Sequence, residues 1–275
     1  EISSVSENSY ANSETSAVSS LKITEASELL FIAAHLAKSG IISHNAKALM
    51  KNMIVRNDVQ VLSILNSFRH KDLVLFLRDL HGMLDQQGFQ IIINLYSNTL
   101  KNENERNCLR NVLEVEFKSI AQILRKAPNS NCRKFFSLGS GCGSALFTAC
   151  VTQNFDYFCG IEKKESLHYL AKTAANFFEK DYKHFLSNDK RVIEFHNESL
   201  LNFDWSDGDL ILANSACFDD ELMKKISALA DGLKVGSTFI TFSKRLSSKK
   251  IKVVYQCCFN MRWGRALAII HQKIP

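Results

Sequence analysis

From residue 134 onward, short apolar runs alternate with longer stretches in which apolar residues recur every three or four positions. The apolar runs are Phe135–Leu138, Tyr157–Ile161, Val192–His196, Leu210–Ala213 and Ser237–Phe242, and the longer stretches are Ser144–Thr152, Glu165–Lys180 and Asp219–Leu233. Short apolar runs indicate buried strands, and the longer repeat predicts amphipathic helices. Strands that alternate with helices predict an α/β fold, with helices on both faces of a parallel sheet.

The alternation stops after the run that ends at Phe242. Two further runs, Ile251–Phe259 and Arg265–Gln272, follow without a helix between them and are joined by Asn260–Gly264. Two neighbouring strands with a short connection predict an antiparallel hairpin. The sheet is therefore expected to end in two antiparallel strands.

The first part of the chain has a different pattern. It opens with a segment rich in Ser, Asn and Glu, which predicts flexibility, and continues with helical repeats separated by short breaks. The predicted domains are residues 1–22, a flexible segment; 23–100, a helical bundle; 101–132, a linker with a lead-in helix at Cys108–Leu124; and 133–275, the sheet domain. We interpret the bundle as an interaction or support module, through which the chain would join a larger complex.

A glycine-rich turn joins the first apolar run to the helix after it. Gly139, Gly141 and Gly143 let the backbone turn sharply and let a ligand lie against it, with Ser140 between them. The spacing Gly-x-Gly-x-Gly, rather than Gly-x-Gly-x-x-Gly, favours S-adenosylmethionine over a dinucleotide. An ordinary strand–turn–helix connection without a ligand is the alternative.

Polar residues also follow the next three apolar runs, at the edge of the sheet where such folds bind ligands. Glu162 is placed to accept hydrogen bonds from two ribose hydroxyls, with a solvated turn carboxylate as the alternative. Glu198 and Ser199 are placed near the adenine. Asn214 is placed beside the transfer centre, where its amide carbonyl can hold an amine. Methyl transfer needs no metal ion, but it needs an aligned nucleophile in a site closed to water.

Composition sets limits on partners and compartment. The net charge of +6 permits an acidic partner without requiring one. Lys249, Lys250 and Lys252 predict a solvated loop, with a weak nucleic-acid or nucleosome contact as the alternative. No apolar stretch is long enough to span a membrane, and the start of the chain lacks a signal-peptide pattern.

The eight cysteines show neither a Cys-x-x-Cys pair nor a histidine spacing typical of zinc. We interpret them as reduced core residues of an intracellular protein, with no disulfide and no metal site. Cys217 has no neighbouring histidine, which favours a core thiol over a catalytic nucleophile.

Several segments resemble the Dot-one type (disruptor of telomeric silencing) family of class I lysine methyltransferases, which use S-adenosylmethionine. The segments are Leu138–Gly141, Gly160–Lys163, Asn214–Leu222 with Leu233–Ser237, and Met261–Gly264, which is similar to the family's tryptophan segment on the final hairpin. The resemblance extends from Cys108 to Lys273 and leaves the predicted bundle outside it.

The resemblance implies a class I fold and transfer of methyl groups to a lysine in the globular part of a histone. It implies that the three glycines hold the methionine part of the cofactor, and that Phe218 and Trp263 wall the lysine channel beside Asn214. An apolar channel fits this chemistry, because desolvation favours the neutral amine that must attack. Histone or nucleosome as partner and the nucleus as compartment also follow from the resemblance, while mitochondrion and cytoplasm stay open.

The chain departs from the family pattern at four places. Ser137 stands where an acidic residue is usual, and Ser199 stands where the family has an aromatic residue. The upstream Tyr-Gly-Glu element is missing, which leaves Glu114 as the candidate for its carboxylate. The second aromatic residue of the channel falls near Ile270.

These departures leave two classes of function open. Ser137, the missing Tyr-Gly-Glu and the helical bundle favour a catalytically inactive subunit with a methyltransferase fold, which serves as a structural component of a larger complex. The intact glycine loop, Glu162 and Asn214 favour the enzyme, since a scaffold needs none of them. An RNA methyltransferase would need an Asp-Pro-Pro-Tyr or Asn-Pro-Pro-Tyr element, which Asn214–Cys217 does not provide.

Overall fold

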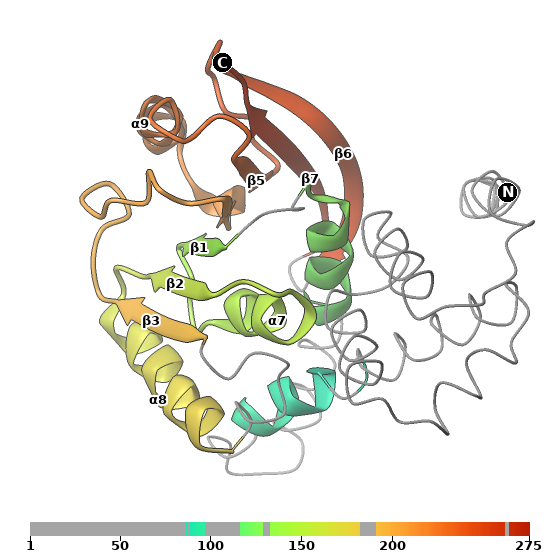
Figure 1. Ribbon diagram of the computed structural model, residues 1–275, viewed down its shortest axis with the longest axis vertical. Helices are drawn as coiled ribbons and strands as arrows, with labels where there is room; N and C mark the ends of the chain where they lie inside the picture. Colours follow the sequence, from blue (N-terminus) through green and yellow to red (C-terminus); the bar gives the residue numbers. More distant parts are fainter. Residues whose placement is uncertain (1–85, 87, 97–115, 129–132, 182–190, 262–263) are drawn as a thin grey trace, which may run out of the picture. The chain divides into compact units, whose positions relative to one another are not determined.

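The computed structural model describes residues 86, 88–96, 116–128, 133–181, 191–261 and 264–275 (Figure 1). The chain divides into two units, Glu1–Met83 and Leu84–Pro275. The predicted flexible segment and the predicted helices up to Leu84 lie outside the described residues. The fold described below is that of the second unit.

A seven-stranded sheet forms the centre of this unit, with the strand order β3-β2-β1-β4-β5-β7-β6. The strands are β1 (Lys134–Leu138), β2 (Tyr157–Ile161), β3 (Val192–His196), β4 (Leu210–Ala213), β5 (Thr238–Phe242), β6 (Ile251–Met261) and β7 (Gly264–Lys273). Strands β1 to β5 are parallel, and β7 pairs antiparallel with both β5 and β6. This order and the antiparallel last pair define the class I methyltransferase sheet, which confirms the predicted fold class.

Helices cover both faces of the sheet. The described helices are α7 (Ser144–Thr152), α8 (Glu165–Asp181), α9 (Asp220–Ala230), the short 3₁₀ helix η2 (Ser215–Cys217), and helices over residues 88–96 and 116–126. Figure 1 shows α9 on one side of the sheet and α7 with the helix over residues 116–126 on the other. The residues after β1, β2 and β4 therefore meet at one edge of the sheet, between two layers of helices.

Two apolar clusters make up the core, one on each face of the sheet. Successive residues of β1 point to opposite faces: Phe135 packs into the cluster that contains α7 and α8, while Phe136 packs into the cluster that contains α9. Trp205 adds to the second cluster and contacts Phe239 edge-on at 5.7 Å. Because both faces of the inner strands are buried, their sequences are continuously apolar rather than alternating.

The helix over residues 88–96 belongs to the sheet unit. Ile92, Leu95 and Tyr96 are buried in the same cluster as α7. Gly88 lies so close to α7 that a Cβ on it would stand 2.9 Å from a methyl carbon of Val151. The two units divide after Met83, and the end of the bundle at residue 100 stays a prediction.

The cysteines only partly match the prediction of core thiols. Cys150 and Cys159 are buried and Cys142 is half-buried, but Cys217, Cys257 and Cys258 are exposed. Two of the exposed thiols lie on β6, which is one of the two edge strands of the sheet, and the third lies on η2 at the end of β4. All six are free. Within the described ranges, no cluster of side chains could hold a metal ion, and no helix is long and apolar enough to cross a membrane.

A buried histidine joins the last strand to the loop after β5. His271 on β7 is 1% exposed, and its Nε2 accepts a hydrogen bond from the backbone N–H of Leu246 at 3.3 Å. Its Nδ1 therefore carries the proton and donates to the carbonyl of Phe239 at 3.0 Å. Burial lowers the pKa of His271 below its ordinary value of 6.5, with a further lowering by Arg245.

We expect the stability of the sheet domain to fall in acid because of His271. The unfolded histidine takes up a proton below about pH 6.5, whereas the folded one resists it, so the stabilisation is complete above that pH and is lost as the pH falls through the folded pKa. One such group contributes at most about 1.4 kcal/mol per pH unit. The urea midpoint should drop between pH 7.5 and pH 5.5, and His271→Gln should reduce that drop. His196→Gln serves as the control, and an equal drop in both variants and the wild type would contradict the assignment.

Candidate functional site

The loop between β1 and α7 is pinned to the end of β2. The backbone N–H groups of Gly139 and Ser140 both donate to the carbonyl of Ile161, at 2.9 and 3.0 Å. Gly139, Gly141 and Gly143 have φ angles of 67°, 57° and 93°, in the left-handed region that favours glycine. The loop is therefore a tight, fixed turn at the carboxyl edge of the sheet.

The three glycines of the loop have different neighbours. A Cβ on Gly141 would meet nothing within 4 Å, so only this glycine opens onto free space. A Cβ on Gly139 would stand 3.3 Å from the ring of Phe218, and one on Gly143 would stand 2.9 Å from Phe195 and 3.0 Å from Phe147. Protein rings therefore fill the space where a Cβ on Gly139 or Gly143 would lie, and a contact of all three glycines with a cofactor stays a prediction.

Glu162 contacts the glycine loop directly. Its Oε2 accepts from the N–H of Gly141 at 2.9 Å, and its Oε1 accepts from the N–H of Lys164 at 2.8 Å. A carboxylate has about four acceptor positions, so these two bonds leave others for hydroxyl groups. The carboxylate is therefore tied to the loop, which sets it apart from the solvated turn that was the alternative.

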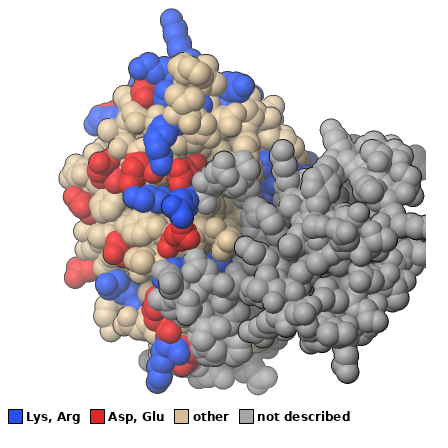
Figure 2. Space-filling view, in the orientation of Figure 1, with Lys and Arg blue, Asp and Glu red and all other residues tan. Residues whose placement is uncertain are grey.

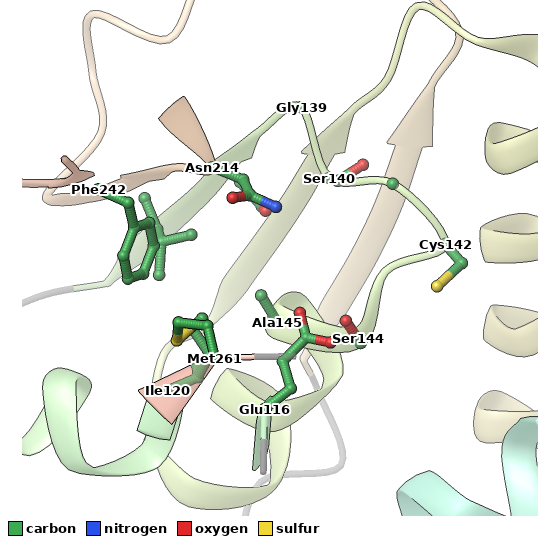
Figure 3. A pocket seen from close by; sticks show the side chains of 13 residues that line it. Glu116, Ile120, Gly139, Ser140, Cys142, Ser144, Ala145, Asn214, Phe242 and Met261 are labelled. Carbon is green, nitrogen blue, oxygen red and sulfur yellow. The ribbon is translucent and has the colours of Figure 1, made fainter. Parts of the chain in front are cut away.

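A small cavity of about 40 Å³ lies between the loop, the end of β4 and the helix over residues 116–126 (Figure 3). It is lined by Glu116, Ile120, Ser137, Gly139, Ser140, Gly141, Cys142, Ser144, Ala145, Leu212, Asn214, Phe242 and Met261. It thus brings together four of the predicted site residues: Gly139, Ser140, Gly141 and Asn214. Gly143, Glu162, Glu198, Ser199 and Phe218 are described but do not line it.

Asn214 is held at this cavity by the residue that follows it. Ser215 is fully buried, and its hydroxyl donates to the carbonyl of Phe242 at 2.9 Å and accepts from the N–H of the same residue at 2.8 Å. The N–H of Asn214 donates to the carbonyl of Leu138 at 3.2 Å. Asn214 is therefore fixed between the ends of β1 and β5, with its side chain at the cavity.

Glu116 is a cavity residue that the sequence analysis missed. The candidate proposed there, Glu114, lies outside the described residues. Glu116 is only 6% exposed, and Figure 3 shows its side chain rising from the helix over residues 116–126 into the cavity. Glu116 lies one helical turn before Ile120 and so shares its face of the helix. A carboxylate on this apolar face is the feature of the sequence that could have identified Glu116. The hydroxyl of Ser119 donates to the carbonyl of Asn260 and ties this helix to the end of β6.

The walls of the predicted lysine channel are only partly described. Trp263 lies outside the described residues. Phe218 packs its ring against Gly139 and the apolar cluster around α9, away from the cavity lining. Ile270 is fully buried in the core beside β5. Phe242 and Met261 supply the apolar wall that borders Asn214 in the structure.

The predicted adenine residues lie in a turn after β3. Glu198 is exposed, and the hydroxyl of Ser199 accepts from the N–H of Leu201 at 3.3 Å. Asn197, which the sequence analysis did not single out as a site residue, donates from its amide to the carbonyls of Glu162 and Lys163 at 2.9 and 3.1 Å. It therefore joins the ends of β2 and β3. The contact of Glu198 and Ser199 with an adenine stays a prediction.

The residues of the cavity fit the methionine part of S-adenosylmethionine. Ser140 Oγ is buried and has no hydrogen-bond partner among the described residues, so it can bond a polar group of a ligand. Glu116 and Asn214 add a carboxylate and an amide, and Gly141 leaves its outer side open. Ligand pockets usually measure about 300–1,000 Å³, so this cavity by itself would take only a part of the cofactor.

Replacing two of the glycines by alanine should separate the backbone effect from the packing effect. Gly141→Ala should lower the free energy of unfolding by roughly 1–2 kcal/mol, the cost of a side chain in left-handed backbone. Gly143→Ala should lower the free energy of unfolding by about 1–3 kcal/mol more than Gly141→Ala does, because its Cβ would press on Phe195 and Phe147. Urea unfolding of both variants measures the difference. Equal losses, or a larger loss for Gly141→Ala, would show that this assignment of the two glycines is wrong.

Comparison with solved structures finds methyltransferases of several kinds. The magnesium protoporphyrin IX methyltransferase of Synechocystis PCC 6803, solved with bound S-adenosylmethionine, is 12% identical over 69% of this chain and 93% of its own, with a TM-score of 0.44. An S-adenosylmethionine-dependent methyltransferase of Clostridium acetobutylicum is 12% identical over 59% of this chain and 94% of its own, with a TM-score of 0.43. The assignment of the fold rests on the strand order given above.

Comparison with curated proteins finds no match. Comparison with protein families finds a match to the family described as histone methylation protein DOT1. It covers residues 89–261, which is more than half of the chain and includes the helix over residues 88–96 from its second residue, the glycine loop and the cavity. The chain therefore belongs to the DOT1 family.

Proposed function

We propose that this protein transfers methyl groups from S-adenosylmethionine to a lysine side chain of a protein, with a histone as the first substrate to test. The observation that carries the proposal is the cavity in which Asn214 and Glu116 lie below the glycine loop, beside the apolar side chains of Phe242 and Met261. The positively charged cofactor that donates the methyl group and the amine that accepts it both need such a combination of polar and apolar groups.

S-adenosylmethionine is the cofactor of this family and of the class I fold, which confirms the predicted cofactor. When bound, it supplies a methyl group on a positively charged sulfur. In this chain, the loop amides and Ser140 would bind the methionine part, and Glu116 would hold its ammonium group. Glu162 would accept from the ribose hydroxyls with the acceptor positions that its two backbone bonds leave open.

The residues around Asn214 suit an amine nucleophile. An apolar wall lowers the pKa of an approaching lysine, because desolvation disfavours its charged form. Phe242 and Met261 are 1% and 4% exposed and supply that wall. The side-chain carbonyl of Asn214 can accept an N–H of the neutral amine and orient its lone pair toward the methyl group.

A histone as substrate accords with the family description and with the charge of the chain. Lys249, Lys250 and Lys252 are exposed, at the start of β6, and would contact an acidic partner such as a nucleosome. On the face shown in Figure 2, basic and acidic side chains intermix over the described part of the molecule. A contact with nucleic acid would therefore be local and weak. The nucleus is the compartment that this proposal implies.

One observation favours the alternative of an inactive structural subunit. Ser137 is 1% exposed and lines the cavity at the position where the family has an acidic residue. The site thus lacks one carboxylate that an active relative would have. Glu116 supplies a carboxylate to the same cavity from another element, which supports the enzyme.

Binding of S-adenosylmethionine should depend on the charge of Glu162. A hydrogen bond to a charged group contributes about 1.5–3 kcal/mol, so Glu162→Gln should raise the dissociation constant by about ten- to a hundredfold. Calorimetric titration of the purified protein measures this change. Glu194→Gln is the control, since Glu194 is an exposed carboxylate that pairs with Tyr157 on β2. No heat from the wild type would favour the structural subunit instead.

Methyl transfer should depend on the side chain of Asn214, whereas the stability of the fold should not depend on it. Asn214→Ala should keep the free energy of unfolding, measured in urea, within about 0.5 kcal/mol of the wild type, since the backbone bonds of residue 214 remain. It should lower transfer from labelled S-adenosylmethionine to nucleosomes by roughly a hundredfold or more, as removal of one positioned polar group does in other enzymes. Transfer that is unchanged in this variant would rule out Asn214 as a catalytic residue. Transfer to no lysine substrate, by a wild type that binds the cofactor, would favour the structural subunit.

A further inference from the structure

The helix over residues 88–96 reaches the glycine loop through one side chain. The hydroxyl of Tyr96 donates to the backbone carbonyl of Cys142 at 2.7 Å, across a separation of 46 residues. Cys142 lies between Gly141 and Gly143 and lines the cavity. We propose that Tyr96 is a positioning residue, which holds the glycine loop in the conformation that binds the cofactor.

The helix that carries Tyr96 is a rigid support. Ile92 and Leu95 are 1% and 2% exposed and pack into the core cluster that contains α7. Gly88 lets the start of the helix lie against Val151 near the end of α7. Tyr96 itself is 6% exposed, so its ring is held by packing and its hydroxyl has a fixed direction. Because the hydroxyl is already held in place, its hydrogen bond to the loop costs little conformational entropy.

The loop needs such an anchor because of its glycines. Gly141 and Gly143 flank Cys142, and glycine loses more backbone freedom on ordering than any other residue. Glu162 holds the N–H of Gly141, and Tyr96 holds the carbonyl of the next residue. Two neighbouring residues of the loop are therefore fixed by side chains from different elements, one after β2 and one on the helix before the sheet.

The protonation state of Tyr96 suits a permanent donor. Burial raises the pKa of Tyr96 well above its ordinary value, and the neighbouring Cys142 and Glu116 raise it further. The hydroxyl therefore keeps its proton at neutral pH and remains a hydrogen-bond donor. A phenylalanine in its place would keep the aromatic ring and remove the hydroxyl that bonds the carbonyl of Cys142.

The consequence for the reaction rests on the proposed function, in which the loop binds S-adenosylmethionine. Loss of the Tyr96 bond leaves the loop free to take other conformations, and only one of them binds the cofactor. The dissociation constant for the cofactor should rise by about three- to tenfold, which is the effect of one neutral hydrogen bond. The turnover number at saturating cofactor should stay within about twofold, because Asn214 and its supports are not touched.

The experiment compares Tyr96→Phe with Tyr157→Phe. The control also removes one phenolic hydrogen bond, from Tyr157 to Glu194 at 2.7 Å, but at the amino end of β2, opposite the loop. Urea unfolding shows whether both variants lose similar stability. Amide hydrogen exchange without cofactor, followed at Gly141 to Ser144, reports on the loop, and calorimetry reports the affinity for S-adenosylmethionine.

The expected result is faster exchange in the loop, by about three- to tenfold, for Tyr96→Phe and unchanged exchange for Tyr157→Phe. Unchanged loop exchange in Tyr96→Phe would overturn the inference, and so would an unchanged dissociation constant in a protein that binds the cofactor. A wild type that binds no cofactor would refute the proposed function, and the exchange experiment would then decide alone whether Tyr96 orders the loop.

Discussion

The carbonyl of Ile161 accepts two successive backbone N–H groups from the glycine loop, and the arrangement of the candidate site depends on this contact. It fixes where the loop leaves β1, and it places Gly141 within reach of the carboxylate one residue further on, Glu162. Because β1 and β2 are neighbouring parallel strands, their carboxyl ends lie side by side, and the loop of one can bond the end of the other. The cofactor loop is in this sense an extension of the sheet.

Close packing around one ring sets a second constraint. Phe195 on β3 is 5% exposed and lies over two glycines, Gly143 in the loop and Gly160 on β2. A Cβ on Gly160 would stand 2.5 Å from that ring, so both positions accept only glycine while Phe195 is present. Glycines that resemble a ligand-binding pattern can thus serve the packing of an aromatic side chain.

The sequence predicts the inner strands of the sheet because both of their faces are buried. The predicted and observed bounds coincide for β2, β3, β4 and α7, and they differ by one to three residues at the ends of the other elements of the sheet domain. A buried parallel strand is a continuous apolar run, which is a strong local signal. Glu162 and Asn214 could be selected for the same reason, since each follows such a run directly.

Contacts between distant segments could not be predicted. Whether Glu116 faces a cavity depends on where its helix meets β6, and the bond from Tyr96 to Cys142 joins residues that are 46 positions apart. The space beside Gly143 is set by Phe195, which no local pattern reveals. Exposure of Cys257 and Cys258 follows from the position of β6 at the edge of the sheet, and strand order is a property of the whole fold.

The pair of hydrogen bonds between Ser215 and Phe242 links the site to the cooperative unfolding of the domain. The residue next to Asn214 is tied to an inner strand, β5, whose five residues are all buried. Segments that share buried contacts of this kind open together rather than one at a time. The backbone hydrogen of Asn214 is bonded to Leu138 and should therefore exchange only when the ends of β1 and β4 separate, so the geometry of Asn214 is as long-lived as the sheet itself.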